Sequence, residues 1–379
     1  MKKLPAILAL LFLSLSVLAE NKAIKPAGSG SAEDPFLISK IEHLVWMSEN
    51  IMNVAEKNFK MTADIDASET ISWDDGRGFL PIGFIEKQKP FYYSFSFCGT
   101  FDGGGHVISN LFIDRKDQCA ALFSSIGIPL SKDDFSTDVL NNIVNRSKNF
   151  ATVKDLALVN CNFTGRNLAA GLAGKIESSL ISRIYVSGNL KSYRLTAGFA
   201  EISNNSCLDE CETDLKFENR YCEAACFFSK SKNSVIKNCL SKGSFQYSED
   251  GYCGAKDKLE YNTPNYSIGL RHKDLGFHSI SLPGEGRLSI NNCLVLNYIL
   301  STKRKKRLFG FSYSENIRNS FYSIDNLQRD PNDKNTAGLK NETLMKKATY
   351  IGWDFDSVWE MEDGKSFPKL RKIEKMLKR

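Results

Sequence analysis

One four-residue phrase recurs along this chain: a branched apolar residue, two polar residues, and a residue that is apolar or small. The copies begin at Ile108, Val153, Ile181, Ile236, Ile290 and Ile317. The steps from 153 to 181 and from 290 to 317 are 28 and 27 residues, and the two steps between 181 and 290 are 55 and 54, about two periods each. The first step, of 45 residues, breaks the count. A fixed period of this size is the signature of a stacked repeat rather than of an ordinary globular domain.

Each repeat unit is too small to enclose a core by itself. Its apolar stretches, such as Val153–Leu158, are short and β-branched, and they end at turn-forming residues, as in Asn160–Gly165. Stacked units bury their apolar rows in a shared interior, so two or three short strands every 27 or so residues predict a parallel β-helix. A leucine-rich repeat has a similar period, but its L-x-x-L-x-L-x-x-N pattern is not consistently present.

The repeat also predicts a register. Equal phase in the repeat gives an equal position in each coil, so the six phrase residues should stack in one inward row. The two doubled steps then require one extra coil near 205–235 and another near 260–285.

The N-terminus has the three parts of an export signal. Two lysines precede an apolar run from Leu4 to Leu18, and Val17-Leu18-Ala19 supplies small residues at the cleavage site. Residues 1–19 are therefore predicted to be a signal peptide; the alternative is a membrane anchor, for which the run is short. No later segment is long and apolar enough to span a bilayer. Cleavage lowers the formal charge from +6 to +4, which is too mild to indicate nucleic-acid binding.

The ten cysteines fall into different groups. Three of them follow an asparagine of the repeat and are expected to be small buried apolar residues in a ladder: Cys161, Cys239 and Cys293. Another three have no evident partner: Cys98, Cys119 and Cys253.

The remaining four have the spacing C-x3-C-x10-C-x3-C: Cys207, Cys211, Cys222 and Cys226. Cysteines four residues apart share a helical face, so this spacing predicts a helical hairpin closed by two nested disulfides. The predicted bridges join Cys207 with Cys226, and Cys211 with Cys222. A zinc site with four cysteine ligands is the alternative, and the oxidising space that an exported protein enters favours the disulfides.

Several other phrases frame the repeats: Gly28–Ile38, Gly99–Leu111, Gly171–Gly174 and Gly352–Trp359. In combination they resemble secreted bacterial GLUG-repeat proteins, and the resemblance covers most of the mature chain. It implies a right-handed parallel β-helix in an exported, adhesin-like protein, and it implies no catalytic set. The cysteine hairpin is not part of the family pattern.

The chain is accordingly divided into five predicted segments. They are the signal peptide (1–19), a flexible lead-in (20–32), an N-terminal cap with the first coils (33–97), GLUG-like repeats with insertions at 128–150, 205–232 and 249–287 (98–325), and a C-terminal cap with a basic tail (326–379). An amphipathic helix containing Ile41, Leu44 and Met47 should cover the open end of the first coil, and Trp353 and Trp359 should close the far end.

No pattern typical of a catalytic, metal or cofactor site is present. H-E-x-x-H, G-x-S-x-G and P-loop motifs are absent, so we predict no catalytic, cofactor-binding or metal-ligating residues. The expected function is that of an exported, non-catalytic protein for surface or extracellular adhesion or binding, located outside a bacterial cell, on its surface or in the periplasm. Its insertions would form the working surface, with a glycan or a cell-surface component as the candidate partner.

Two alternatives remain: a carbohydrate-active β-helix enzyme and a purely structural matrix protein. Such an enzyme needs two carboxylates that face each other about 5–10 Å apart. Neighbouring coils can supply such a pair, and the candidates are Asp114 or Asp117 together with Asp155.

Overall fold

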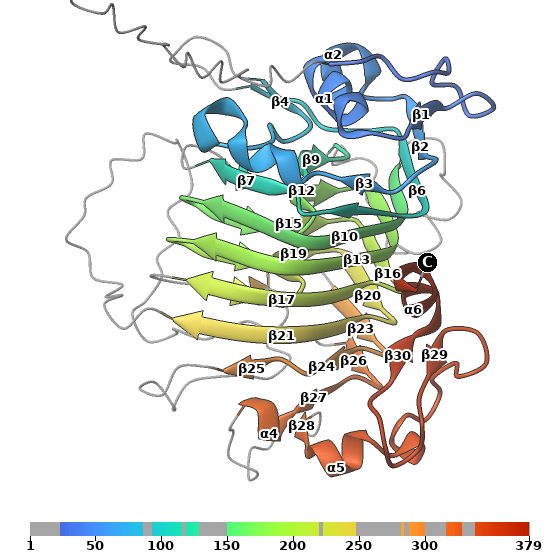
Figure 1. The fold of residues 1–379 in the computed structure, drawn as a ribbon. Coiled ribbons are helices and arrows are strands. Elements are labelled where there is room, and N and C mark those ends of the chain that lie inside the picture. The colour runs from blue at the N-terminus through green and yellow to red at the C-terminus, as the bar shows by residue number, and fades with distance from the viewer. Residues whose placement is uncertain are drawn as a thin grey trace, which may run out of the picture.

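The computed structural model describes residues 23–85, 93–115, 119–128, 150–219, 223–247, 282–283, 288–299, 316–327 and 338–378. Within them the chain winds repeatedly through three parallel β-sheets, and successive coils stack on one another (Figure 1). The predicted fold class, a right-handed parallel β-helix, is confirmed. Four details of the prediction are wrong: the helical hairpin, the place of the C-terminal tryptophans, the place of Ile108 and the second extra coil.

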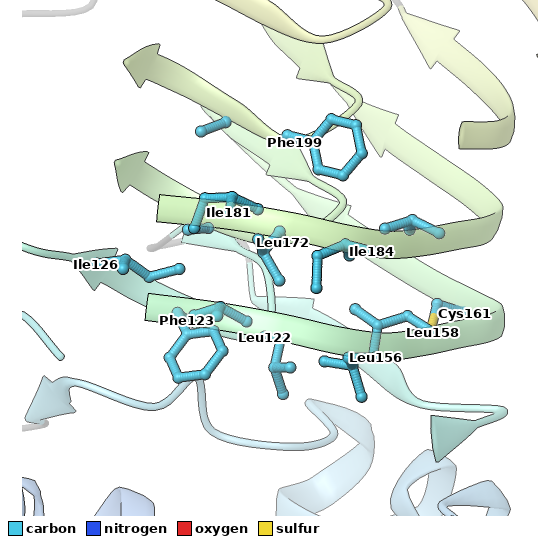
Figure 2. Close-up of a cluster of buried hydrophobic side chains, with 14 of the residues drawn as sticks. Leu122, Phe123, Ile126, Leu156, Leu158, Cys161, Leu172, Ile181, Ile184 and Phe199 are labelled. Atoms are coloured by element: carbon cyan, nitrogen blue, oxygen red, sulfur yellow. The ribbon is translucent and has the colours of Figure 1, made fainter. Parts of the chain in front are cut away.

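One complete coil illustrates the arrangement. It consists of β10 (Ala151–Gly165), β11 (Leu168–Ala170) and β12 (Ala173–Glu177), each in a different sheet. The next coil repeats them as β13 (Ser179–Ser192), β14 (Leu195–Ala197) and β15 (Ala200–Asn204). Each strand pairs in parallel with its counterpart one coil later. The inward side chains of these coils therefore form one continuous core (Figure 2).

The other coils follow the same plan on both sides. Earlier in the chain lie β6 (Thr100–Ser109), β7 (Phe112–Arg115), β8 (Cys119–Ala120) and β9 (Phe123–Ile126). Later strands are β16 (Cys207–Asp209), β17 (Glu212–Asn219), β18 (Glu223–Ala225), β19 (Phe228–Lys232), β20 (Ser234–Lys237), β21 (Leu240–Tyr247) and β22 (Leu282–Pro283). The last are β23 (Leu288–Asn291), β24 (Leu294–Val295), β25 (Tyr298–Ile299), β26 (Asn316–Arg318), β27 (Phe321–Ser323) and β28 (Gly338–Leu339).

The recurring phrase forms a corner of the coil. Its third residue has a left-handed backbone with φ between 47° and 60° in all six copies: Asn110, Asp155, Arg183, Asn238, Asn292 and Asn319. Asparagine and aspartate adopt this conformation at a lower cost than most residues. The corner thus explains why five of the six copies carry Asn or Asp at that position.

Five of the six phrase residues stack in one inward row, as predicted. Strand register aligns Val153, Ile181, Ile236, Ile290 and Ile317, with Leu208 between Ile181 and Ile236. Ile108 does not belong to this row, because it pairs with Leu158, and Phe101 lies opposite Val153. The first phrase makes a second corner of the coil, shared with Asn160, whose φ is also positive. This different corner and the inserted residues 128–150 together account for the step of 45 residues.

Of the two extra coils that the doubled steps required, one is present. Residues 205–232 form it, with β16 between β13 and β20. The second is absent from the stack, since β20 pairs directly with β23 and Ile236 lies opposite Ile290. The added length falls in the predicted insertion 249–287, of which the structure describes residues 282–283. The insertion 128–150 likewise lies outside the described residues except at its two ends.

The predicted helical hairpin at 205–232 is therefore wrong, because this segment is a regular coil. Cys207 and Cys211 lie on either side of a corner at Glu210, whose φ is 52°, and not on one helical face. In β17 the residues Leu215 and Phe217 alternate inward, which is the period of a strand. The spacing of four residues between Cys207 and Cys211 spans the corner at Glu210, and this corner also interrupts the inward–outward alternation of side chains along the strand.

The N-terminal segment caps the first coil, as predicted. β1 (Phe36–Ile38) and β2 (Asn58–Met61) begin the stack, and α1 (Ile41–Glu49) and α2 (Ile51–Val54) lie over its open end (Figure 1). β3 (Ile65–Asp66) continues along β6, and two 3-10 turns, Ser68–Ser72 and Asp74–Gly76, follow. A short antiparallel pair, β4 (Phe84–Ile85) with β5 (Tyr93–Ser94), completes this end. Buried apolar residues of α1 join the core of the coils.

The C-terminal segment does more than close the far end. α4 (Ile324–Leu327) and α5 (Asn341–Leu344) lie there, and a 3-10 turn, Lys347–Thr349, follows. The chain then turns back along the outside of the large sheet as β29 (Trp359–Glu360), β30 (Lys369–Leu370) and α6 (Arg371–Leu377) (Figure 1). The two tryptophans pack in a cluster outside the coils, so their predicted role in closing the core is wrong.

Candidate functional site

The best-defined cluster of ionisable groups lies beneath the C-terminal segment. It is built on an outward-facing row of the large sheet, one residue from each coil: Val107, Ala157, Tyr185, Glu212, Leu240, Leu294 and Phe321. Six of the seven are apolar or aromatic, and Trp353, Trp359 and the buried face of α6 pack against that row. A surface row of this composition is stable in water because the C-terminal segment covers it.

Glu212 is the exception in this row, and it is buried. Its side chain is 1% exposed, and its Oε1 forms an ion pair with Lys242 Nζ at 2.5 Å. Burial raises the pKa of Glu212 above the usual glutamate range, while Lys242 opposes that rise. Burial tends to lower the pKa of Lys242, but the adjacent Glu212 carboxylate outweighs it and the pKa of Lys242 is raised. The ion pair holds a charge in an otherwise apolar row.

Further charged groups surround this ion pair. The Glu374 carboxylate on α6 and the Asp214 carboxylate on β17 both act to raise the pKa of Glu212. Lys372 of α6 forms an ion pair with Glu210 at 3.1 Å, which connects the helix to the corner of the coil. Two ion pairs therefore lie where α6 meets the coils. Glu212–Lys242 is within the sheet, and Glu210–Lys372 joins the coil to the helix.

A tyrosine, a glutamate and a lysine in proximity are the residue types that general acid–base catalysis uses. Here the arrangement does not suit it. Tyr185 and Glu212 are 8% and 1% exposed beneath the C-terminal segment, and burial raises the pKa of Tyr185 above its usual range. A substrate cannot reach either group in this conformation. The cluster therefore holds the C-terminal segment on the coils and is no open catalytic site.

The carboxylates considered from the sequence are not brought together. Asp114 lies opposite Thr164 near one end of β10, whereas Asp155 lies at the corner near the other end. Asp155 forms a bidentate ion pair with Arg183. Asp102 forms a single ion-pair contact with Lys154, at 3.0 Å. Asp117 lies outside the described residues. The described part of the chain therefore contains no facing pair made from these residues.

The cysteines are grouped differently from the prediction. Cys207 packs with Phe150 and Val235 on the outside of the coil, whereas Cys226 lies in the core, where its thiol contacts Asn297 Oδ1 at 3.4 Å. Both are free thiols in this structure, and their places on the outside and in the core do not support the predicted Cys207–Cys226 bridge. Cys211 is also a free thiol, and Cys222, its predicted partner, lies outside the described residues. Cys253 lies outside them as well.

A regular polar row follows the outside of the coils, three residues before the covered apolar row in most coils and on the other side of the corner. Its members are spaced one coil apart and are at least partly exposed: Asp102, Lys154, Ser182, Asp209, Lys237, Asn291 and Arg318. Acidic and basic members alternate in part, and Lys154–Asp102 and Lys237–Asp209 are both separated by 3.0 Å. We refer to these seven residues as the outer polar row. With coils about 4.8 Å apart, it presents polar groups at a constant interval.

The two histidines in the described ranges, His43 and His106, do not come together in a site. His43 is 8% exposed in α1, where its Nδ1 accepts a hydrogen bond from the Ser39 amide, and burial lowers the pKa of His43. His106 contacts Asp64 at the glycine turn, at 3.0 Å. His272 and His278 lie outside the described residues, as does the basic run Lys303–Arg307. Within the described ranges, no group of three or more His, Cys, Asp or Glu side chains is placed to hold a metal ion.

Sequence reasoning missed the Glu212–Lys242 pair and the row beneath the C-terminal segment. A signal was available, because aligning the coils by their period places Glu212 in a column with Ala157, Tyr185 and Leu240. A charged residue in an otherwise apolar column indicates a buried ion pair or a functional group.

Comparisons with known proteins agree with the architecture described above. This is a parallel β-helix protein, and its fold resembles the crystal structure of a "putative immunoglobulin A1 protease" from Bacteroides ovatus. The TM-score is 0.57 with 14% identity, over 91% of this chain and 94% of the other. At this identity the likeness concerns the fold alone.

The sequence is also 30% identical over 162 residues to Halomucin from Haloquadratum walsbyi. This match spans 43% of the present chain and 2% of Halomucin. No family model matches the chain. Among the described residues, no helix has the length and apolarity needed to cross a membrane.

Proposed function

We propose that this protein is an exported, non-catalytic β-helix protein that binds a glycan or another cell-surface component at the surface of a bacterium, outside it or in its periplasm. The observation that carries the proposal is the outer polar row, which offers an extended ladder of hydrogen-bonding and charged side chains at a constant interval. Solenoids commonly use such repeated surfaces for binding. A linear polymer has repeated polar groups of its own, so it can contact several coils at once.

Three further points support the proposal. In the Tyr185–Glu212–Lys242 cluster, which has the residue types of a catalytic site, the tyrosine and the glutamate are buried beneath the C-terminal segment. Residues 1–19 have the pattern of an export signal, and the name of the partial relative Halomucin suggests a mucin-like extracellular protein. The GLUG-like phrases point in the same direction.

The test begins with the mature chain from Glu20, whose intact mass after export also checks the predicted cleavage. It is applied to a glycan array and to isolated cell-envelope fractions. The variant Lys154→Ala/Lys237→Ala removes two exposed cations of the outer polar row, and Lys365→Ala, 78% exposed in the C-terminal segment, is the matched control. Binding should weaken at least about tenfold in the row variant and stay unchanged in the control.

The other outcomes distinguish the alternatives. Binding that survives loss of both row lysines would place the contact elsewhere and contradict the proposed surface. Release of shortened or unsaturated oligosaccharides from a glycan would indicate a carbohydrate-active enzyme. Absence of binding to every glycan and envelope fraction would favour a purely structural matrix protein.

A further inference from the structure

Three cysteines occupy one inward column of the core. Cys211, Cys239 and Cys293 each follow the left-handed corner residue of their coil: Glu210, Asn238 and Asn292. The flanking strands fix their alignment, because Asp209 pairs with Lys237 and Glu212 with Leu240, and the same holds one coil later. The three residues therefore stand directly above one another in successive coils.

The three thiols make the same backbone contact in each coil. Each Sγ donates to the carbonyl oxygen two residues earlier, at 3.1–3.2 Å. Burial raises the pKa of Cys239, and the neighbouring Cys211 and Cys293 thiols act in the same direction. All three residues are fully buried and belong to the main core. Cys239 thus has two equivalent neighbours.

The spacing of coils suits a disulfide between neighbours and excludes one across the whole column. Adjacent parallel strands lie about 4.8 Å apart, within the Cα separation of roughly 4.4–6.8 Å that disulfides span. Cys211 and Cys293 are two coils apart, about 9.6 Å, which is beyond that range. Cys161 has no such neighbour, since Gly188 occupies its position in the next coil.

We propose that this column is an oxidation site at which Cys239 forms a single disulfide, with either Cys211 or Cys293, leaving the third thiol free. The two thiols lose two protons and two electrons as the S–S bond forms. A disulfide oxidant, either a small molecule or an oxidoreductase, accepts them and is reduced to two thiols. Such oxidants are the ordinary source of disulfides in exported proteins.

Thiol–disulfide exchange between this column and the oxidant takes place before the coils are completely stacked. In the finished core the three thiols are inaccessible, and burial raises the pKa of Cys239 far above its usual range, so little thiolate is present. The Cys211 and Cys239 coils are separated by 28 residues of sequence and the Cys239 and Cys293 coils by 54, so the nearer pair meets first during folding.

The test is refolding of the mature chain in a buffer of reduced and oxidised glutathione, followed by acid quench, alkylation and non-reducing peptide mapping. The expected product has one bridge that contains Cys239. Cys211→Ser should give Cys239–Cys293, Cys293→Ser should give Cys211–Cys239, and Cys239→Ser should give neither. Cys161→Ser, another buried core cysteine that follows a left-handed corner, is the control and should leave the bridge in place.

The free-thiol count gives a second and independent result. Replacing Cys239 removes a cysteine that was bridged and releases its partner as a free thiol, so the free-thiol count per chain should rise by one relative to the original protein. Cys161→Ser should lower it by one. If a serine variant fails to fold, the alanine variant at the same position replaces it, and the original chain alone still decides the matter. Free thiols at all three of Cys211, Cys239 and Cys293 in the refolded chain, or a bridge from Cys211 to Cys293, would overturn the proposal.

Discussion

Replacing Lys242 with methionine should destabilise this protein far more than its position near the surface suggests. The Lys242 side chain is 31% exposed, whereas its partner Glu212 is 1% exposed and lies in an apolar row beneath the C-terminal segment. Removing the lysine leaves a buried carboxylate without its counter-charge, and its Oε2 already makes no hydrogen bond within the described residues. The expected cost is about 3–5 kcal/mol at neutral pH.

The reverse change should be mild. In Glu212→Leu the lysine can extend into water, and the new leucine continues the apolar row between Tyr185 and Leu240. The double variant Glu212→Leu/Lys242→Met should be between neutral and about 4 kcal/mol more stable than the original protein. The two single changes are therefore strongly non-additive, with a coupling energy of at least about 3 kcal/mol.

The cost of Lys242→Met should also depend on pH in a defined direction. The folded-state pKa of Glu212 is raised by burial, so its contribution favours the fold below the unfolded glutamate pKa of about 4.3 and is lost as pH rises through the folded value. Without Lys242 that pKa rises further. The destabilisation should therefore be largest at neutral pH and shrink as the pH falls toward about 4.

Urea unfolding followed by tryptophan fluorescence suits the measurement, because Trp353 and Trp359 pack over this row. Lys216→Met is the matched control on the neighbouring strand: Lys216 is 41% exposed and its partner Glu218 is 30% exposed, so its loss should cost at most about 1 kcal/mol. If Lys242→Met costs no more than Lys216→Met at pH 7, or if its cost grows as the pH falls, the buried-charge argument is refuted.

Three further changes test other parts of the fold. Asn238→Ala should cost about 1 kcal/mol and Asn238→Gly much less, since φ is 53° at that corner; equal costs in urea unfolding would contradict the conformational explanation. Phe199→Ala should cost about 3–5 kcal/mol in the same assay, because this fully buried ring stacks on Phe227, and a cost near zero would place it outside the core. Trp359→Ala should release the C-terminal segment, so limited proteolysis should cleave after about residue 340 while the coils stay intact; unchanged resistance would indicate that other contacts hold it.

The main features of the coils could be predicted because they follow from local phase. Val153, Ile181 and Ile236 occupy the same place in their coils for the reason that they occupy the same place in the repeat. The Asn or Asp of the phrase marks a backbone angle that few other residues adopt. The misplaced Ile108 shows the limit of this reasoning, because the same four-residue phrase makes either of two corners and only pairing distinguishes them.

The cysteines show a second limit. A spacing of four residues is compatible with one face of a helix and with two sides of a strand corner, and the sequence pattern around Cys207 and Cys211 did not separate them. Once the corner is placed at Glu210, Cys211 joins the column of Cys239 and Cys293, and Cys207 turns outward. The difference between the predicted and the observed neighbours of Cys207 and Cys211 follows from the left-handed backbone angle at Glu210.

The sequence by itself determined the stack: its period, its corners and the apolar row that each coil contributes to the core. Only the tertiary structure decided what covers the outside of that stack. The contact between Glu210 and Lys372 joins residues 162 positions apart, and the docking of the C-terminal segment has no period that a sequence can display. Coils pair with neighbours at a fixed separation, so their contacts repeat along the chain, whereas a segment that folds back makes each contact once. The buried charge of Glu212 and its covering helix belong to this second kind.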